Sequence, residues 1–124
     1  MTSTEIYFCD TYALIELLNG NPDYANYIYA DLVTLDLNLM ELYYSSLRDS
    51  GKHIANKDFH QFVPFSYSFS KSIIPIAMEF KLKYRKENLS YVDCVGYVFA
   101  KQNNLLFLTG DEKFEKKENV KFVK

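Results

Sequence analysis

The sequence predicts an α/β fold: a three-layer α/β/α sandwich around a central, mostly parallel sheet of four to five strands. Short runs of apolar and β-branched residues alternate with helical patterns of ten or more residues. This order is typical of parallel strands that are joined by right-handed helical crossovers. The length of 124 residues is that of one domain. We therefore expect a single domain over residues 1–124.

The N-terminal part of the chain predicts two strands and two helices. Residues 5–9 form a short β-prone run, and apolar residues at helical spacing then predict a helix over residues 11–18, which Asn-Gly ends. A second helix is expected over residues 21–30, because Pro22 is compatible with a first helical turn. The apolar and β-branched run at residues 31–36 predicts the second strand.

The middle of the chain is predicted to be mainly helical. Asn38 is expected to cap a third helix, whose apolar residues recur at helical spacing until Ser50-Gly51. A weaker helical pattern covers residues 54–61. The run Phe-Val-Pro-Phe at residues 62–65 is a candidate third strand.

The C-terminal part predicts three further helices and two strands. Helical spacing covers residues 72–86 and, after Ser90, continues to about residue 102. Residues 105–109 form a continuous apolar run, as expected for a strand that is buried on both faces. A short helix should begin at Asp111, and residues 120–123 are expected to form an edge strand.

Composition and charge exclude several classes of protein. With 48% hydrophobic and 24% charged residues, the chain is not intrinsically disordered. The net charge of −2 does not by itself indicate a nucleic-acid partner. The charge is unevenly distributed, however: residues 1–62 hold 9 acids and 3 bases, a balance of −6, whereas residues 63–124 hold 7 acids and 11 bases, a balance of +4. A local basic face is therefore compatible with the composition.

Cysteine content and hydropathy indicate the cellular compartment of the protein. Cys9 and Cys94, in a chain with no charged-then-apolar leader, are interpreted as reduced thiols that serve as small buried hydrophobic residues. The longest apolar stretch, residues 73–78, is far shorter than the roughly 20 residues that cross a bilayer. We expect a cytoplasmic protein with no membrane partner.

Four acidic residues are predicted to lie at or near the beginnings of helices. They are Asp10, Glu41, Asp93 and Asp111. Each has a simple local explanation. Asp10 and Asp111 are suitable N-caps, and Glu41 and Asp93 each follow a capping residue, Asn38 or Ser90, by three positions, as in a capping box.

Considered together, the same four acids favour a metal site. Helices that follow parallel strands begin at the carboxyl edge of the sheet, where ligands bind in open α/β folds. Carboxylates gathered there repel one another unless one is protonated or a cation lies between them. Oxygen donors without a Cys or His cluster favour Mg²⁺ or Mn²⁺ over zinc, and such an ion in an open cleft is typical of phosphoryl chemistry.

Four segments of the sequence surround these acids: Ile6–Leu14, Asn38–Tyr43, Ser90–Ala100 and Leu108–Phe114. They resemble the signature segments of PIN-domain proteins, in the same order. The similarity covers nearly the whole chain and is greatest to the small VapC-like toxin ribonucleases of VapBC-type toxin–antitoxin pairs. Tyr12 and Gly110 are less typical neighbours of the acids, and a bulky Tyr12 beside Asp10 would narrow the cleft.

The resemblance implies a function and a set of site residues. Asp10, Glu41, Asp93 and Asp111 would be the metal-binding acids, and Thr109 would match the hydroxyl residue that often precedes the last of them. The implied activity is Mg²⁺- or Mn²⁺-dependent endonucleolytic hydrolysis of single-stranded or structured RNA, leaving a 5′-phosphate and a 3′-hydroxyl. The implied partners are the RNA substrate and a cognate antitoxin protein.

Two other functions are weighed against this one. The first is a catalytically silent PIN-like module that binds RNA or protein, in which the acids are only helix caps. The second is a receiver-like or phosphatase-like domain. Domains of this second kind usually carry another acid beside the first-strand aspartate, and Cys9-Asp10-Thr11 lacks that pair.

Other polar and aromatic residues allow more than one interpretation. His53 and His60 lie in a polar segment and are expected to be solvated. The basic cluster at Lys81, Lys83, Arg85 and Lys86 fits either a helix C-terminus or contact with RNA phosphates. Lys113, Lys116 and Lys117 alternate with glutamates, as on a solvated face. Eleven tyrosines exceed what a small core easily buries, which favours a homodimer interface; stacking on RNA bases is the alternative.

Overall fold

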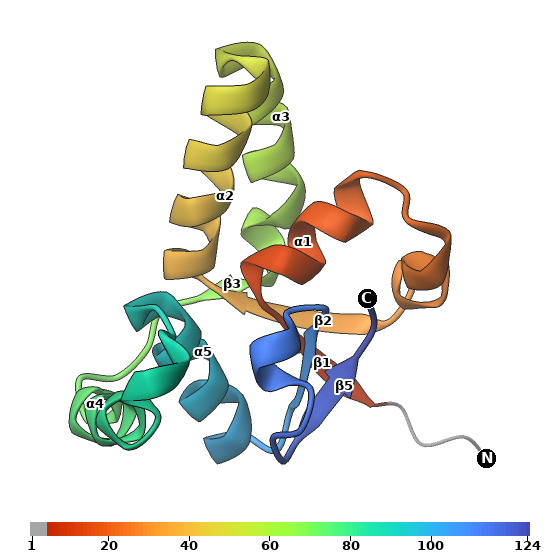
Figure 1. Cartoon of the computed structure of the whole chain (residues 1–124). Helices are drawn as coiled ribbons and strands as arrows, with labels where there is room; N and C mark the ends of the chain where they lie inside the picture. The colour runs from red at the N-terminus through yellow and green to blue at the C-terminus, as the bar shows by residue number, and fades with distance from the viewer. Residues whose placement is uncertain (1–4) are drawn as a thin grey trace.

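Five short parallel strands form the centre of the computed structural model, which describes residues 5–124 (Figure 1). The strands are β1 (Ile6–Cys9), β2 (Asp31–Leu35), β3 (Ser66–Tyr67), β4 (Leu106–Thr109) and β5 (Val120–Phe122). The α-helices are α1 (Thr11–Leu18), α2 (Asp36–Ser50), α3 (Lys52–Phe62), α4 (Ile73–Lys83) and α5 (Tyr91–Gln102). The 3₁₀ helices are η1 (Pro22–Tyr27), η2 (Val63–Phe65), η3 (Arg85–Glu87) and η4 (Glu112–Phe114).

The strand order is β3-β2-β1-β4-β5, and every neighbouring pair is parallel. Phe8 in β1 is in register with Val33 in β2 and Phe107 in β4. Because all strands run the same way, the segments that follow them emerge at one edge of the sheet. The predicted sandwich with a parallel sheet is confirmed.

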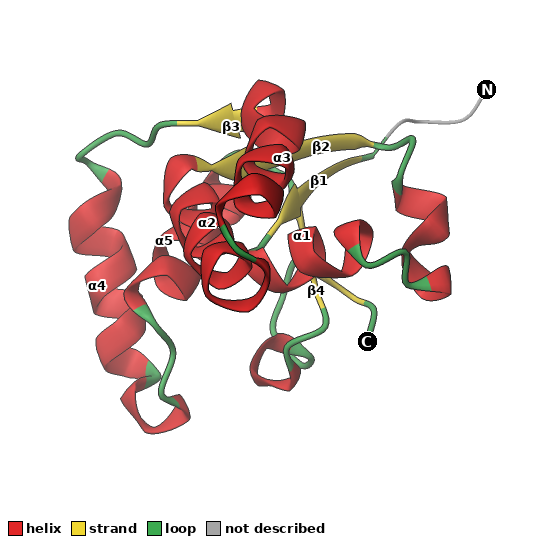
Figure 2. Cartoon of the chain, turned by 90° about the horizontal axis from the view of Figure 1, so that it is seen from above, coloured by secondary structure: helices red, strands yellow, loops and turns green. Residues whose placement is uncertain are grey.

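Different helices cover the two faces of the sheet (Figures 1 and 2). The face that presents Phe8 and Phe107 packs against α4 and α5. The opposite face, with Cys9 and Leu108, packs against α1 and the sheet-proximal ends of α2 and α3. The α2–α3 hairpin extends beyond the sheet (Figure 1). This alternation of neighbouring residues between two cores explains why the inner strands read as continuous apolar runs.

Aromatic packing fixes α5 on the sheet. Phe107 of β4 is fully buried, with its ring centroid 5.5 Å from that of Tyr97 in α5, and the ring centroid of Phe8 lies 5.9 Å from that of Phe99 in α5. Gly96 faces β1, and a Cβ at this position would lie 3.0 Å from the Phe8 ring. A residue without a side chain therefore lets α5, the helix that carries Asp93, approach the central strand closely.

Both cysteines are free and buried, as predicted. Burial raises the pKa of the Cys94 thiol to about 11, and it also raises the pKa of Cys9. Both thiols therefore stay protonated at neutral pH and act as small core residues.

Two predictions for the middle of the chain are wrong. Asn38 does not cap the third helix, because α2 already begins at Asp36 with Leu35 as its N-cap, and Asn38 is buried inside the helix. The run 62–65 is not a strand: α3 continues to Phe62, residues 63–65 form η2, and pairing with β2 begins only at Ser66. Proline in this run lacks the N–H that a strand donates, which favours the 3₁₀ turn.

Two predicted helices are shorter than expected. The helix expected over residues 21–30 is the 3₁₀ helix η1. The helix expected over residues 72–86 divides into α4, which ends at Lys83, and η3. No helix within residues 5–124 is long and apolar enough to cross a membrane.

Candidate metal centre

The structure places the predicted site residues along the carboxyl edge of the sheet. Asp10 directly follows β1, Thr109 ends β4 and Asp111 follows it. Asp93 lies in the first turn of α5, and Glu41 lies in the second turn of α2, which continues directly from β2. The carboxyl edge of the three adjacent strands β2, β1 and β4 thus carries most of the predicted site residues.

Asp10 is the most enclosed of the four acids, with 4% of its surface exposed. As the N-cap of α1, it accepts the Ala13 N–H at Oδ1 (2.9 Å), and it accepts the Thr109 hydroxyl at Oδ2 (2.5 Å). Burial raises the pKa of the Asp10 carboxyl from its ordinary value of 3.8 to about 7. The charges of Asp93 and Asp111 act in the same direction, and the two hydrogen bonds oppose them.

Glu41 is oriented by a chain of hydrogen bonds. Its Oε1 accepts the Thr11 hydroxyl at 2.6 Å, and Thr11 Oγ1 in turn accepts an N–H of the Asn38 amide at 3.2 Å. Burial raises the pKa of Glu41, and the charge of Asp93 adds to this effect. Because α2 begins five residues earlier, at Asp36, Glu41 caps no helix. Helix capping therefore does not explain why it lies here.

Asp93 and Asp111 each fix one carboxylate oxygen by capping. Asp93 Oδ2 accepts the Ser90 N–H, while Ser90 Oγ accepts the Asp93 N–H, each at 3.0 Å, which confirms the predicted capping box. Asp111 Oδ1 accepts the Lys113 N–H at 3.0 Å. Within residues 5–124, the second oxygen of each of these two carboxylates accepts no hydrogen bond. Capping thus orients these acids and leaves one oxygen of each available to a ligand.

Thr109 connects two of the acids. Its hydroxyl donates to Asp10 Oδ2 and accepts the N–H of Asp111 at 3.0 Å. Thr109 is completely buried, so one side chain fixes both the carboxylate after β1 and the backbone after β4. Thr109 therefore orients the carboxyl groups of this edge.

The charges of the four acids interact along this edge of the sheet. Asp93 raises the pKa of both Asp10 and Glu41, and Asp111 raises that of Asp10, so their charges interact. Within residues 5–124, however, no three His, Cys, Asp or Glu side chains converge as a metal site. The donors present are carboxylate and hydroxyl oxygens, which suit a hard ion such as Mg²⁺ or Mn²⁺. A cation would also relieve the repulsion around buried Asp10.

Thr11 and Asn38 hydrogen-bond to the predicted site through Glu41, and the sequence analysis did not identify this contact. Asn38 has 2% of its surface exposed, and its Oδ1 has no hydrogen-bond partner within the described residues. The available signal in the sequence was an Asn among the apolar residues of a predicted helix, three positions before Glu41, because Asn is a poor helix former.

The two unusual neighbours, Tyr12 and Gly110, fit each other. A Cβ at Gly110 would lie 2.3 Å from Tyr12 Cε1 and 2.5 Å from the Val123 carbonyl oxygen. The Tyr12 ring thus fills the space that a side chain at residue 110 would need. Packing against Gly110 places the Tyr12 ring near Val123, close to the C-terminus.

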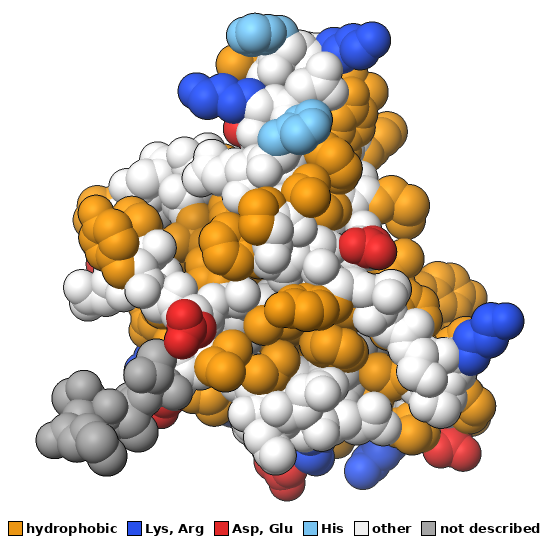
Figure 3. Space-filling view, turned by 180° about the vertical axis from the view of Figure 1, so that it is seen from behind, with side chains coloured by type: hydrophobic (Ala, Val, Ile, Leu, Met, Phe, Trp, Pro, Cys, Tyr) orange, Lys and Arg blue, Asp and Glu red, His pale blue; other side chains and the backbone are white. Residues whose placement is uncertain are grey.

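The histidines lie away from the acids. Both are exposed residues of α3, and Figure 3 shows histidine side chains at the projecting end of the molecule, over the α2–α3 hairpin. His60 Nδ1 lies 2.7 Å from the backbone oxygen of Asn56. Exposure agrees with the prediction that both are solvated.

The fold and the site together define the class of protein: an α/β domain with a parallel sheet and acidic residues along the carboxyl edge of that sheet. The sequence matches the model of the PIN domain family over residues 7–120, and the chain belongs to this family. A search of curated protein sequences gives no significant match.

Several solved structures with the same fold are toxin–antitoxin proteins, although sequence identity is low. The sarcin–ricin-loop-cleaving toxin VapC20 of Mycobacterium tuberculosis is 16% identical, with a TM-score of 0.74, covering 96% of this chain and 97% of that one. DNA-bound VapBC of Salmonella typhimurium is 12% identical, with a TM-score of 0.73 and 98% coverage of both chains. VapBC2 of Rickettsia felis, bound to a promoter fragment, is 19% identical, with a TM-score of 0.71 and coverage of 95% and 97%.

The raised pKa of Asp10 predicts a distinct pH dependence of stability in the metal-free protein. The folded pKa of about 7 lies above the unfolded value of about 3.9. The folded state therefore binds more protons between these pH values, and the free energy of unfolding falls as pH rises through the window. We expect urea denaturation to show this fall in the free energy of unfolding in the wild type and a smaller one in Asp10→Asn.

Asp31→Asn, on the opposite edge of the sheet, is the control and should follow the wild type. Parallel curves for the wild type and Asp10→Asn would contradict the prediction.

The contact between Tyr12 and Gly110 predicts coupled stability effects. Gly110→Ala should lower the free energy of unfolding by about 1–3 kcal/mol, because the new methyl group overlaps the ring and a carbonyl oxygen. The loss should be smaller in a Tyr12→Ala background, since the ring is the nearest obstacle. A double-mutant cycle measured by thermal denaturation tests this, and additive effects would show that the two positions do not interact.

Proposed function

We propose that this PIN domain is a Mg²⁺- or Mn²⁺-dependent endoribonuclease and the toxin of a toxin–antitoxin pair. The observation that carries the proposal is the position of Glu41. It is half-buried, held by Thr11 and coupled electrostatically to Asp93, in a place where it caps nothing. A domain whose acids served only as helix caps would not need this residue. The catalytically silent alternative is therefore less favoured.

The acids have separate roles in the proposed reaction. Asp10, Glu41, Asp93 and Asp111 would hold the divalent ion, which would supply an activated water and stabilise charge on the scissile phosphate. Thr109 and Thr11 hold the Asp10 and Glu41 carboxylates in fixed orientations by hydroxyl hydrogen bonds. Asn38, through Thr11, restricts the orientation of Glu41. No protein nucleophile is required for this hydrolysis.

A protein partner and a homodimer belong to the same proposal. Beside Glu41, a groove of about 540 Å³ lies between α1 and α2, with Met40 and Tyr44 60% and 65% exposed. An antitoxin segment that covered this apolar rim would also cover the carboxylates. The support from known proteins is that Salmonella VapBC and Rickettsia VapBC2 share the fold. Exposed tyrosines, with Tyr29 at 95%, supply surface for a second copy.

Cleavage of labelled single-stranded RNA tests the proposed activity. The wild type should cut with Mg²⁺ or Mn²⁺ and stop when the ion is chelated. Asp10→Asn and Asp93→Asn should each lower kcat/KM at least about 100-fold, because they remove ligands of the ion. Gel electrophoresis of the products measures the rates.

The matched control is Asp31→Asn, which removes an exposed carboxylate at the amino edge of the same sheet. It should cut at the wild-type rate, and circular dichroism should show all variants folded. Equal cleavage by the wild type, Asp10→Asn and Asp93→Asn would refute the assignment of the acids. No cleavage by any form under any divalent ion would favour the silent binding module.

A further inference from the structure

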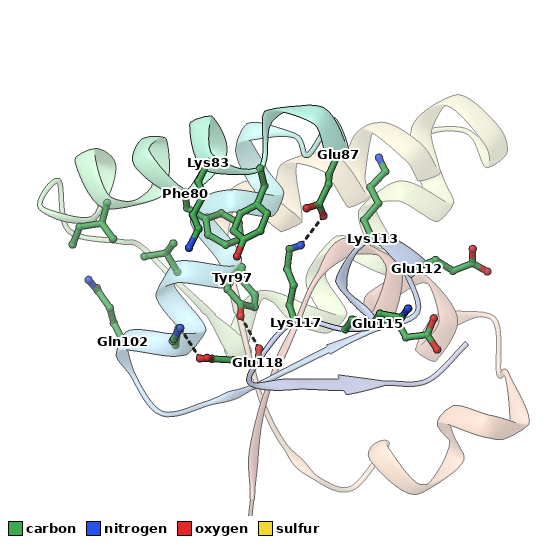
Figure 4. Close-up of a pocket in the computed structure, with 15 residues that line it drawn as sticks. Phe80, Lys83, Glu87, Tyr97, Gln102, Glu112, Lys113, Glu115, Lys117 and Glu118 are labelled. Atoms are coloured by element: carbon green, nitrogen blue, oxygen red, sulfur yellow. Dashed lines mark hydrogen bonds and ion pairs between the residues drawn. The ribbon is translucent and has the colours of Figure 1, made fainter.

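A second hollow lies between α4, α5 and the segment that includes η4 (Figure 4). Its volume is about 1010 Å³. Lysines line it from three elements: Lys83 from α4, Lys101 from α5, and Lys113, Lys116 and Lys117 from η4 and the residues after it. None of these residues belongs to the proposed metal centre.

The hollow continues the side of α5 that carries Asp93. Tyr97 and Lys101 follow Asp93 at intervals of four residues, so all three lie on one side of the helix. Tyr97 and Lys101 line the hollow, which therefore extends about 6–12 Å along α5 from Asp93. At the end of the hollow nearest to the acids, Lys113 follows Asp111 by two residues. Its Nζ donates to the backbone oxygen of Asn88 at 3.2 Å, and Asn88 lies two residues before Ser90 of the Ser90–Asp93 capping box.

After the ion pairs between lysines and glutamates are taken into account, the lining of the hollow keeps a net positive charge. Lys117 pairs with Glu87 at 2.6 Å and Lys101 with Glu118 at 2.9 Å, while Glu112 pairs with Lys124. Within residues 5–124, the remaining lysines Lys83, Lys113 and Lys116 form no ion pair with an acid, and Glu115 is the remaining carboxylate of the lining. Three unpaired cationic groups thus face one unpaired anionic group.

The aromatic floor does not offer free faces to nucleobases. Lys117 Nζ lies 4.1 Å from the centroid of the Tyr84 ring, and Phe80 stacks on Tyr97 at 4.9 Å. Tyr97 is itself buried and donates its hydroxyl hydrogen to the backbone carbonyl oxygen of Glu118. A ligand in this hollow therefore meets lysine ammonium groups at its rim, and these suit phosphates better than bases.

We infer that this hollow holds the sugar–phosphate backbone of the RNA strand outside the cleavage site, through Lys83, Lys113 and Lys116. The inference rests on the proposed function, since it supplies the track by which a long substrate reaches the acids. Contacts of this kind are independent of base sequence and strengthen binding without taking part in the chemistry. The basic balance of the C-terminal half of the sequence then has a specific use.

The test compares two pairs of neutralising substitutions. Lys83→Gln with Lys116→Gln alters the hollow, and Lys52→Gln with Lys57→Gln removes the same charge from α3, on the projecting hairpin (Figure 1). Binding of a labelled single-stranded RNA of about 20 nucleotides is measured by fluorescence anisotropy without divalent ions, over a range of KCl concentrations. Lys113 is left intact because it also holds the loop before α5.

We expect the first pair to raise Kd on the order of tenfold at about 0.1 M KCl, and to make the slope of log K against log salt shallower by about 1.4. In cleavage assays it should raise KM with kcat unchanged, and a trinucleotide too short to reach the hollow should show no difference from wild type. The α3 pair should leave the salt slope nearly unchanged.

Three results would overturn the inference. One is equal RNA binding by the two double variants while the wild type still cleaves RNA. This result would leave the proposed function intact and would indicate another ligand for the lysines of the hollow, for example an acidic protein. The second is a wild type that neither binds nor cleaves RNA, which would remove both proposals. A loss of kcat with unchanged Kd would also contradict a role in backbone binding.

Discussion

The burial of one carboxylate at the end of a central strand is the constraint on which the site depends. Asp10 is almost completely enclosed, and burial makes its ionised form costly. The fold offsets this cost with a helix N-terminus, through Ala13 N–H, and with the hydroxyl of Thr109 from the neighbouring strand. Further acids placed around Asp10 increase the cost again. A protein that keeps such an arrangement stabilises it with a proton or with a cation, and the oxygen-only donors favour a hard divalent ion.

Capping and ligand binding are compatible roles for the same side chain. Asp10, Asp93 and Asp111 each cap a helix, and the cap orients the carboxyl group; for Asp93 and Asp111 one oxygen remains without a hydrogen bond in the described part of the chain. Parallel topology then brings helix starts from distant segments to one edge. Local stability and chemistry therefore select the same residue types at the same positions. Glu41 is the exception, because its orientation comes from Thr11 and Asn38 rather than from the backbone.

The parallel sheet, apart from β3, and the helix-start positions of Asp10, Asp93 and Asp111 could be predicted from sequence because both depend on local patterns. Apolar runs mark the strands, and acids follow them at helix starts. The start of α2 could not be predicted, since β2 continues into the helix without a side-chain cap and Leu35 carries no signal. The Thr11–Asn38 hydrogen bonds and the fit of Tyr12 against Gly110 join separate segments, so they depend on tertiary packing. The same holds for the lysine-lined hollow, whose residues read as an ordinary mixed-charge surface.

The titration of the Asp10 carboxyl group, followed by ¹³C NMR with and without Mg²⁺, tests the proposed metal centre most directly. Without metal, the resonance should titrate with a pKa of about 7. With a saturating diamagnetic ion such as Mg²⁺, the pKa should fall by at least about one unit, because a nearby cation favours the carboxylate. An Asp10 pKa that the ion leaves unchanged would show that the buried carboxylate and its neighbours do not form a metal site.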